Sequence, residues 1–227
     1  MTVNLLKRLE SSVEAFRLTL AKIEVAVDES LTRLASQSGA VIDRSADVGG
    51  FDLDIDDAED ASLEAVSFGD KITIDLRDID VESWQRDLWN DRETLRRLLD
   101  EMLKVTPDRD LKLQRLKRLI VDKAERPFNS GNRKALIFSA FADTAEYLYR
   151  ELTPALADVG LDTALVTGGA HAAKTTLGTG HDVQQVLTLF SPKSKQRHLT
   201  MPTSTGELDV LIGTDVISEG QNLQEDR

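Results

Sequence analysis

The chain has 227 residues, no Cys, 5% aromatic residues and a formal net charge of −12. This length allows one large or two small domains, and the lack of Cys excludes disulfide bridges, thiolate metal sites and thiol nucleophiles. No apolar run approaches the ~20 residues of a membrane span, and the N-terminus lacks the pattern of a signal peptide, so we expect a cytoplasmic protein.

The first predicted element is a long amphipathic helix over residues 3–36. Apolar side chains recur along it by alternating steps of three and four, which is the spacing of one helix face. The members of this stripe are Leu6, Leu9, Val13, Phe16, Leu20, Ile23, Val27, Leu31 and Leu34. Such a stripe either packs within its own domain or forms a coiled-coil seam with another chain, and we favour the first interpretation.

Residues 43–70 account for most of the net negative charge. They hold ten acidic residues against one Arg, so the rest of the chain carries a net charge of only −3. Low hydrophobicity and dense like charge predict a flexible, solvated insertion. Asp52, Asp54 and Asp56 match the start of an EF-hand calcium loop, but the later Gly and Glu of that loop are missing, so we expect no calcium site.

Residues 71–76 are expected to form a short strand or an extended lead-in, and a second long helix is predicted at 81–105. Thr106 followed by Pro107 is typical of the N-cap and first position of a third helix, which we expect to end near Glu125, before Pro127. These elements complete a helical region over residues 1–127.

The remaining residues, 128–227, alternate between strands and helices. Strands are predicted at 134–139, 162–169 and 208–212, and helices at 141–158 and 181–190. Pro154 is expected to end or kink the first of these helices. Alternation of this kind is typical of α/β folds, in which the strands pair in parallel through right-handed crossovers.

The stretch LDVLIGTDVISEGQNLQ (208–224) is the strongest candidate for a functional site. An apolar strand ends at Gly213 and delivers a polar turn, which is how open α/β sheets build ligand sites at the carboxyl ends of their strands. An ordinary strand-to-loop connection can have the same pattern. The polar turn contains Thr214, Asp215, Ser218, Glu219, Gly220, Asn222 and Gln224.

The sequence of this stretch resembles motif V of superfamily-two helicases and translocases, most closely the bacterial Swi/Snf-type members. TD, EG and NLQ stand at the offsets of that motif. ALIFSAFADTAEYL resembles motif IV of the same family, and VTGG resembles the strand-end turn between the two motifs. DLKLQRLKRLI and LLKRLESSVEAF are similar to helices that flank the motor lobes. The resemblance covers roughly residues 108–225 well and residues 1–42 loosely.

The resemblance implies an incomplete second RecA-like lobe with a parallel sheet, preceded by the helical region. The parent protein would be an ATP-dependent DNA translocase or helicase and an ATP hydrolase, with motif V coupling the nucleotide state to grip on DNA. Glu219 is the implied coupling residue. The implied nucleotide-binding residues are Gly220 and Asn222, and the implied nucleic-acid-binding residues are Thr214, Asp215, Ser139, Thr167 and Gly168.

The same resemblance implies partners and cofactors of the intact parent. These are nucleic acid, DNA rather than RNA, together with ATP, magnesium and the first RecA-like lobe of the same protein. Neither that lobe nor the arginine-rich motif VI is found in the 227 residues. Phosphoryl transfer depends on such positioned cations. We therefore expect a fragment that has no ATPase activity alone and holds no tightly bound cofactor.

Two other classes of function stay open. GGAHAAKT (168–175) fits the phosphate-binding pattern G-x-x-x-x-G-K-[ST] except for Ala173, which suggests a small nucleotide-binding enzyme that uses Lys174. The long apolar stripe suggests instead a non-catalytic helical interaction module. The basic cluster of Lys193, Lys195 and Arg197 is either a nucleic-acid contact near the expected nucleic-acid face or a solvated face. The three His residues lack metal-ligand spacing.

Overall fold

The computed structural model describes residues 2–37, 48–49, 73–74, 80–168, 173–217 and 223. Along these residues the chain divides into two compact units between residues 106 and 107. The division falls earlier than the change of sequence pattern near residue 128. Nearly all of the acidic segment 43–70 lies outside the described residues, so its flexibility and its lack of a calcium site stay predictions.

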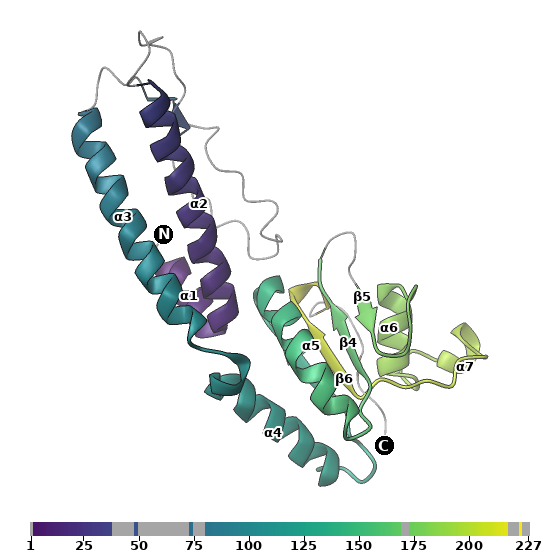
Figure 1. Cartoon of the computed structure of the whole chain (residues 1–227). Helices are drawn as coiled ribbons and strands as arrows, with labels where there is room; N and C mark the ends of the chain where they lie inside the picture. The colour runs from purple at the N-terminus through teal and green to yellow at the C-terminus, as the bar shows by residue number, and fades with distance from the viewer. Residues whose placement is uncertain are drawn as a thin grey trace. The chain divides into compact units, whose positions relative to one another are not determined.

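The first unit consists mainly of three helices: α1 (Thr2–Ser11), α2 (Val13–Gln37) and α3 (Val81–Leu103). The single helix predicted for residues 3–36 is wrong, because the chain breaks at Ser12. The Ser12 side chain accepts a hydrogen bond from the backbone N–H of Ala15 at 3.1 Å, so it caps a new helix. Helices α2 and α3 lie side by side and run antiparallel (Figure 1).

The apolar stripe of α2 packs within its own unit. Val27, Leu31 and Leu34 are buried against Leu88 of α3. The intramolecular interpretation of the stripe is therefore confirmed for this part of the helix. Short strands β1 (Val48–Gly49) and β2 (Thr73–Ile74) pair antiparallel in the same unit.

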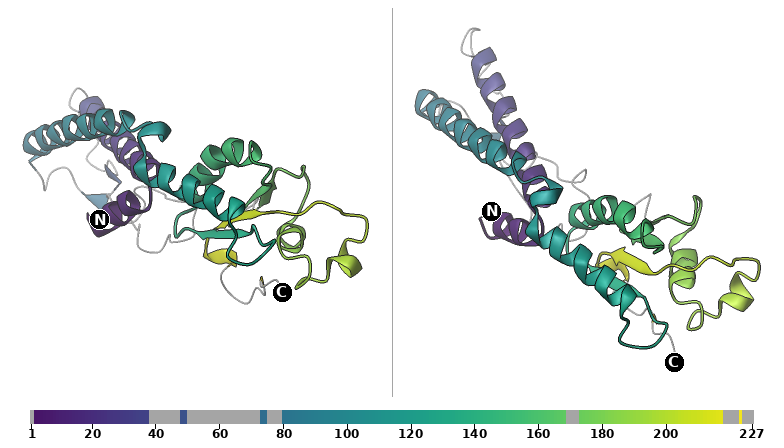
Figure 2. Two further views of the ribbon diagram at one scale, coloured as in Figure 1. Left: turned by 90° about the horizontal axis from the view of Figure 1, so that it is seen from below. Right: turned by 60° about the horizontal axis from the view of Figure 1, so that its bottom comes forward.

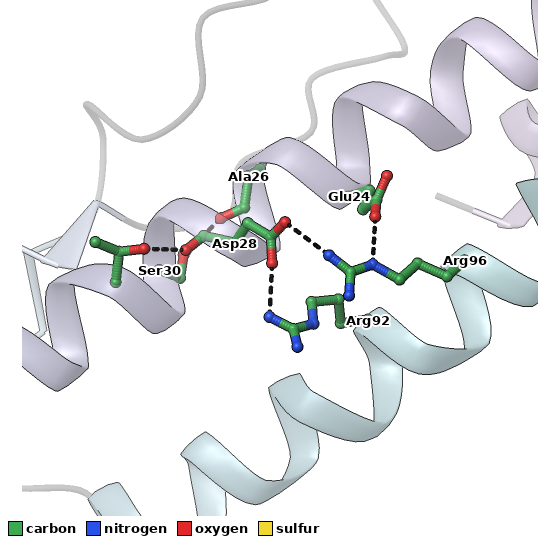
Figure 3. Close-up of polar contacts among 7 residues, drawn as sticks. Glu24, Ala26, Asp28, Ser30, Arg92 and Arg96 are labelled. Atoms are coloured by element: carbon green, nitrogen blue, oxygen red, sulfur yellow. Dashed lines mark hydrogen bonds and ion pairs between the residues drawn. The ribbon is translucent and has the colours of Figure 1, made fainter.

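Ion pairs join the two long helices beside this apolar contact (Figure 3). The Arg92 guanidinium lies 3.0 Å from Asp28, and Arg96 lies 2.8 Å from Glu24 and 3.4 Å from Asp28. The hydrogen bond that Arg96 donates to Glu24 raises the pKa of the Arg96 guanidinium. Partly exposed pairs of this kind add little stability, so the burial of α2 against α3 is the main source of cohesion.

The second unit is a mixed α/β domain. Its helices cover a four-stranded sheet of order β3-β6-β4-β5. The elements are η3 (Pro107–Arg109), α4 (Leu111–Glu125), β3 (Ala135–Phe138), α5 (Ala142–Ala157), β4 (Thr163–Val166), β5 (Ala173–Thr175), α6 (Val183–Phe190), α7 (Arg197–Thr200), β6 (Val210–Gly213) and η4 (Asp215–Ile217).

Strands β3, β6 and β4 are parallel, and β5 is antiparallel to β4. Every residue of β4 and β6 is buried. Because alternate side chains of a strand point to opposite faces, both faces of these two strands are covered. Leu165 and Ile212 pack against α4 and α5, whereas Ala164 and Leu211 pack against α6. The sheet therefore lies between two helical layers (Figures 1 and 2).

Two local expectations are wrong in this unit. The N-cap of α4 is Asp110 rather than Thr106, because its side chain accepts from the backbone N–H of Leu113 at 3.0 Å. Pro154 does not end α5, which continues to Ala157.

Substitution of Asp110 is expected to have a large effect on the stability of the α/β unit. It is buried, and its second carboxylate oxygen accepts a hydrogen bond from the Tyr147 hydroxyl at 3.0 Å. Asp110→Ala removes the helix cap and leaves a buried hydroxyl without this partner. We expect a loss of about 2–4 kcal/mol in the free energy of unfolding. Urea unfolding followed by tyrosine absorbance measures it, since both Tyr residues lie in α5.

The matched control is Asp80→Ala. Asp80 caps α3 through Ser83 at 3.1 Å but is exposed, so only about 1 kcal/mol is expected. Its effect is followed by tryptophan fluorescence, because both Trp residues lie in α3. An equal cost for the two substitutions would show that the Tyr147 contact contributes nothing.

Candidate functional site at the carboxyl edge of the sheet

Three hydroxyl side chains stand in a row where the parallel strands end. Phe138, Gly213 and Val166 are paired in register at the ends of β3, β6 and β4. The next residue of each strand is Ser139, Thr214 and Thr167, respectively. Neighbouring strands lie about 4.8 Å apart, so these three residues, named here the hydroxyl row, form one edge. This is the edge at which open α/β sheets bind ligands.

The backbone holds the hydroxyl row in place. The N–H of Ser139 donates to the carbonyl of Gly213 at 2.9 Å, and the N–H of Thr214 donates to the carbonyl of Val166 at 3.2 Å. The ladder thus continues one residue beyond each strand. The Ser139 hydroxyl also donates to the carbonyl of Phe141 and accepts from its N–H, at 3.0 and 3.1 Å. These bonds fix the turn into α5.

Thr214 is the member of the row with an unmet bonding capacity. It is 1% exposed, and its Oγ1 has no hydrogen-bond partner among the described residues. A buried hydroxyl without a partner costs about 1–3 kcal/mol. Groups of this kind are uncommon in native folds and point to a water, an ion or a ligand.

Gly213 makes the turn after β6 possible. A Cβ at this position would lie 2.3 Å from Cδ1 of Ile217 and 3.1 Å from the carbonyl oxygen of Val166. Only Gly therefore allows η4 to fold back so closely that Ile217 is buried under the strand end. The sequence marked Gly213 as a break in the strand, but the close approach of Ile217 could not be read from it.

The described residues expected to bind nucleic acid do meet at this edge. Ser139, Thr167 and Thr214 are buried, whereas Gly168 and Asp215, which directly follow two of them, are exposed. Ala140, which follows Ser139, is exposed too, so Ala140, Gly168 and Asp215 belong to the exposed surface of this edge. Glu219, Gly220 and Asn222 lie outside the described residues, and their roles stay predictions.

The position of Lys174 does not fit the phosphate-loop alternative. Lys174 lies in the middle of β5, paired with Leu165 of β4. It is exposed, with its Nζ 3.5 Å from the Glu146 carboxylate. The Lys of a phosphate-binding loop stands where a loop enters a helix. Here an antiparallel strand and then a turn take that place. This strand was not predicted.

The basic cluster lies elsewhere. Lys193 and Arg197 line a cavity together with Lys134 and Asp209, which precede β3 and β6. Because β3 and β6 are parallel, this cavity is at their amino-terminal edge. Lys193 and Arg197 therefore line the edge opposite to the hydroxyl row, although the Ser191 hydroxyl, two residues before Lys193, donates to the carbonyl of Leu223 in the motif V-like stretch at 3.0 Å.

Comparison with known proteins gives no further guide. No protein-family model, no curated protein and no solved structure matches this chain. Within the described ranges, no three His, Asp or Glu side chains are grouped so as to hold a metal ion. None of the described helices is long and apolar enough to cross a membrane. The chain's own residues are thus the basis for inferring its function.

Proposed function

We propose that the α/β unit is a RecA-like lobe of an ATP-dependent DNA translocase, and that its carboxyl edge contacts the phosphate backbone of nucleic acid. The observation that carries this proposal is the buried hydroxyl of Thr214 in the motif V-like stretch, which has no hydrogen-bond partner among the described residues. The mostly parallel sheet and the alignment of Ser139 and Thr167 with Thr214 also support it. These residues come from the motif IV-like segment and the VTGG turn.

The chemistry of the edge suits phosphate oxygens. A hydroxyl donates one hydrogen bond, and a bond to a charged acceptor is stronger than one to a neutral acceptor. Gly168 has no Cβ and is exposed, so a phosphate can approach its backbone closely. Contacts of this kind position a protein on nucleic acid without reading its sequence. The burial of Thr214 requires a small opening of the turn for direct contact, or a bridging water.

In the proposed intact motor the edge works with a first RecA-like lobe. That lobe supplies the groups that hold ATP and magnesium, Gly220 and Asn222 lie beside the nucleotide, and Glu219 couples nucleotide state to grip. The overall charge of −12 does not oppose this role. Residues 107–227 contain 15 Lys and Arg against 16 Asp and Glu, so this unit is close to neutral (15 − 16 = −1).

Thr214→Val tests the contact on this chain. The substitution keeps the shape of the side chain and removes the hydroxyl. We expect duplex DNA binding to weaken about tenfold, the equivalent of ~1.4 kcal/mol for one lost charge-assisted bond. Folding stability should not fall, because an unpaired buried hydroxyl is replaced by a methyl group. Fluorescence anisotropy of labelled duplex at a fixed low salt concentration measures the affinity.

Thr163→Val is the matched control. Thr163, like Thr214, is a buried Thr whose Oγ1 has no partner among the described residues. It lies at the amino end of β4 and not at the carboxyl edge of the sheet. Its substitution should leave DNA affinity unchanged, and Thr214→Ser should retain it. Equal affinities for Thr214→Val, Thr163→Val and the wild type would contradict the proposed contact.

A further inference from the structure

A cavity of about 940 Å³ opens at the amino-terminal edge of the sheet, at the ends of the strands opposite to the hydroxyl row. Three segments form its walls: residues 128–134 before β3, residues 192–204 around α7, and Glu207 and Asp209 before β6. All of them belong to the α/β unit. The volume falls within the range of small-ligand sites.

The walls of this cavity carry unbalanced positive charge. Four cations, Arg133, Lys134, Lys193 and Arg197, face two carboxylates. Both carboxylates are engaged within the protein. Glu207 pairs with Lys134 at 2.6 Å, and the Asp209 carboxylate accepts from the backbone N–H of Asp162 at 3.0 Å.

The two arginines are oriented without being neutralised. Arg133 donates to the carbonyls of Val159 and Gly160 at 3.2 and 3.1 Å, and Arg197 donates to the carbonyl of Gly206 at 2.5 Å. Among the described residues neither guanidinium has a carboxylate partner. Each keeps further N–H donors in a planar fork, the arrangement that matches phosphate oxygens.

An aromatic ring stands at the same cavity. Phe128 lines it and is 92% exposed, which is unusual for so large an apolar side chain. Met201 and Pro202 add apolar surface to the wall. An exposed aromatic ring next to phosphate-binding cations is the combination that binds nucleotides of single strands, because the ring stacks on a base while the cations hold the backbone.

The cavity wall is tied to the rest of the unit. Lys123 of α4 donates to the carbonyls of Asn132 and Lys134, and burial lowers the pKa of Lys123. Lys134 in turn donates to the carbonyl of Leu208 at 3.0 Å. These bonds hold the segment before β3 against α4 and β6, so the cations are positioned before a ligand arrives.

We propose that this cavity binds a phosphorylated nucleoside, either as a free nucleotide or within a single strand of nucleic acid. Arg133, Arg197 and Lys193 hold the phosphate, and Phe128 stacks on the base. An acidic peptide would use the same cations but would gain nothing specific from the ring. The site is separate from the hydroxyl row, and it does not depend on the function proposed above.

Binding of a labelled oligothymidine of about 12 nucleotides to the whole chain, at about 50 mM salt, tests the proposal by fluorescence anisotropy. Phe128→Ala is expected to weaken binding at least about fivefold, the lower limit for one base–aromatic stack. The double variant Arg133→Gln, Arg197→Gln is expected to weaken it at least about tenfold. Unlabelled AMP distinguishes the sources: displacement of the strand identifies a free-nucleotide site, and its absence identifies a strand site.

Matched controls carry the same chemical changes outside the cavity. Leu111→Ala shortens an 80% exposed apolar side chain of α4, and Arg118→Gln removes an exposed charge of the same helix. Both should bind as the wild type does. Where loss of the Arg133 and Arg197 contacts to carbonyls unfolds the double variant, Lys193→Gln replaces it, because the Lys193 side chain is exposed.

Three results would overturn the proposal: no strand or AMP binding by the wild type, wild-type affinity of Phe128→Ala, or equal displacement by polyglutamate of matched charge. The last result would identify a site for any polyanion. Thr214→Val should retain the Phe128-dependent binding. A failure at this cavity and a failure at the hydroxyl row are therefore distinguishable.

Discussion

Gly213→Ala is expected to destabilise the α/β unit by about 2–3 kcal/mol, a large effect for one added methyl group. The new Cβ would lie 2.3 Å from Cδ1 and 2.8 Å from Cγ1 of Ile217. Ile217 is 1% exposed and packs against the buried side chains beside α6, so it has little space to move. Urea unfolding followed by tyrosine absorbance measures the loss.

A double-mutant cycle with Ile217→Ala identifies the cause. Ile217→Ala alone leaves a cavity and is costly, but it removes the two Ile217 atoms that lie closest to the new methyl group and leaves only the carbonyl of Val166 at 3.1 Å. The double variant should therefore cost at least about 1 kcal/mol less than the sum of the two single ones. Gly206→Ala is the control, because the atoms nearest to its Cβ belong to the flexible side chain of Leu177, at 3.0 Å and beyond. Simple additivity at Gly213 and Ile217 would rule out the steric explanation.

The second large effect is expected in catalysis by an intact motor, in which this chain acts with a first RecA-like lobe. Glu219→Ala and Asn222→Ala should lower DNA-stimulated ATP hydrolysis by more than about tenfold, while DNA affinity changes by less than about threefold. Grip on DNA is spread over many modest phosphate contacts, so it survives the loss of one side chain. The response of ATP hydrolysis to DNA depends instead on the few residues that link the two ligands.

Thr214→Val is expected to have the opposite pattern of effects in the same assay. It should weaken DNA binding and leave basal ATP hydrolysis nearly unchanged. The measurements are ATPase rates with and without duplex DNA, together with DNA affinity at one salt concentration. Wild-type stimulated turnover in the Glu219 and Asn222 variants would remove the basis for the motif V assignment.

The sequence predicts much of the fold wherever an apolar run is long enough to identify a buried strand. The runs ALIF (135–138), TALV (163–166) and VLIG (210–213) are mostly apolar, are each followed by Ser or Thr, and form the three parallel strands. Their parallel pairing also follows from the alternation with helices. Because each strand delivers a hydroxyl residue at its end, the composition of the candidate site was predictable as well.

The errors arise where a local interaction overrides that pattern. The apolar stripe of residues 3–36 continues through Ser12, so periodicity alone could not reveal that its hydroxyl starts a new helix. In GGAHAAKT the Gly and Lys spacing imitates a phosphate loop, although Ala173–Thr175 pair with β4 as a three-residue strand. A strand so short has no periodicity to detect.

The cavity at the amino-terminal edge could not be predicted for a different reason. Its cations come from segments around residues 133, 193 and 197, which only the pairing of β3 with β6 brings to one edge. In the sequence Lys193 and Arg197 stand close to the motif V-like turn. In the fold they line the edge opposite to the hydroxyl row, while Ser191 contacts Leu223 at the far end of the motif V-like stretch.

The claim that the carboxyl edge meets nucleic acid is tested most directly by backbone amide resonances of the whole chain during titration with duplex DNA. The resonances of Ser139, Thr167, Gly168 and Thr214 are predicted to shift together, saturably, and less at higher salt. The same titration of Thr214→Val should need a higher DNA concentration. The account would be contradicted if DNA bound while these four resonances stayed in place, or if no resonance of the α/β unit moved.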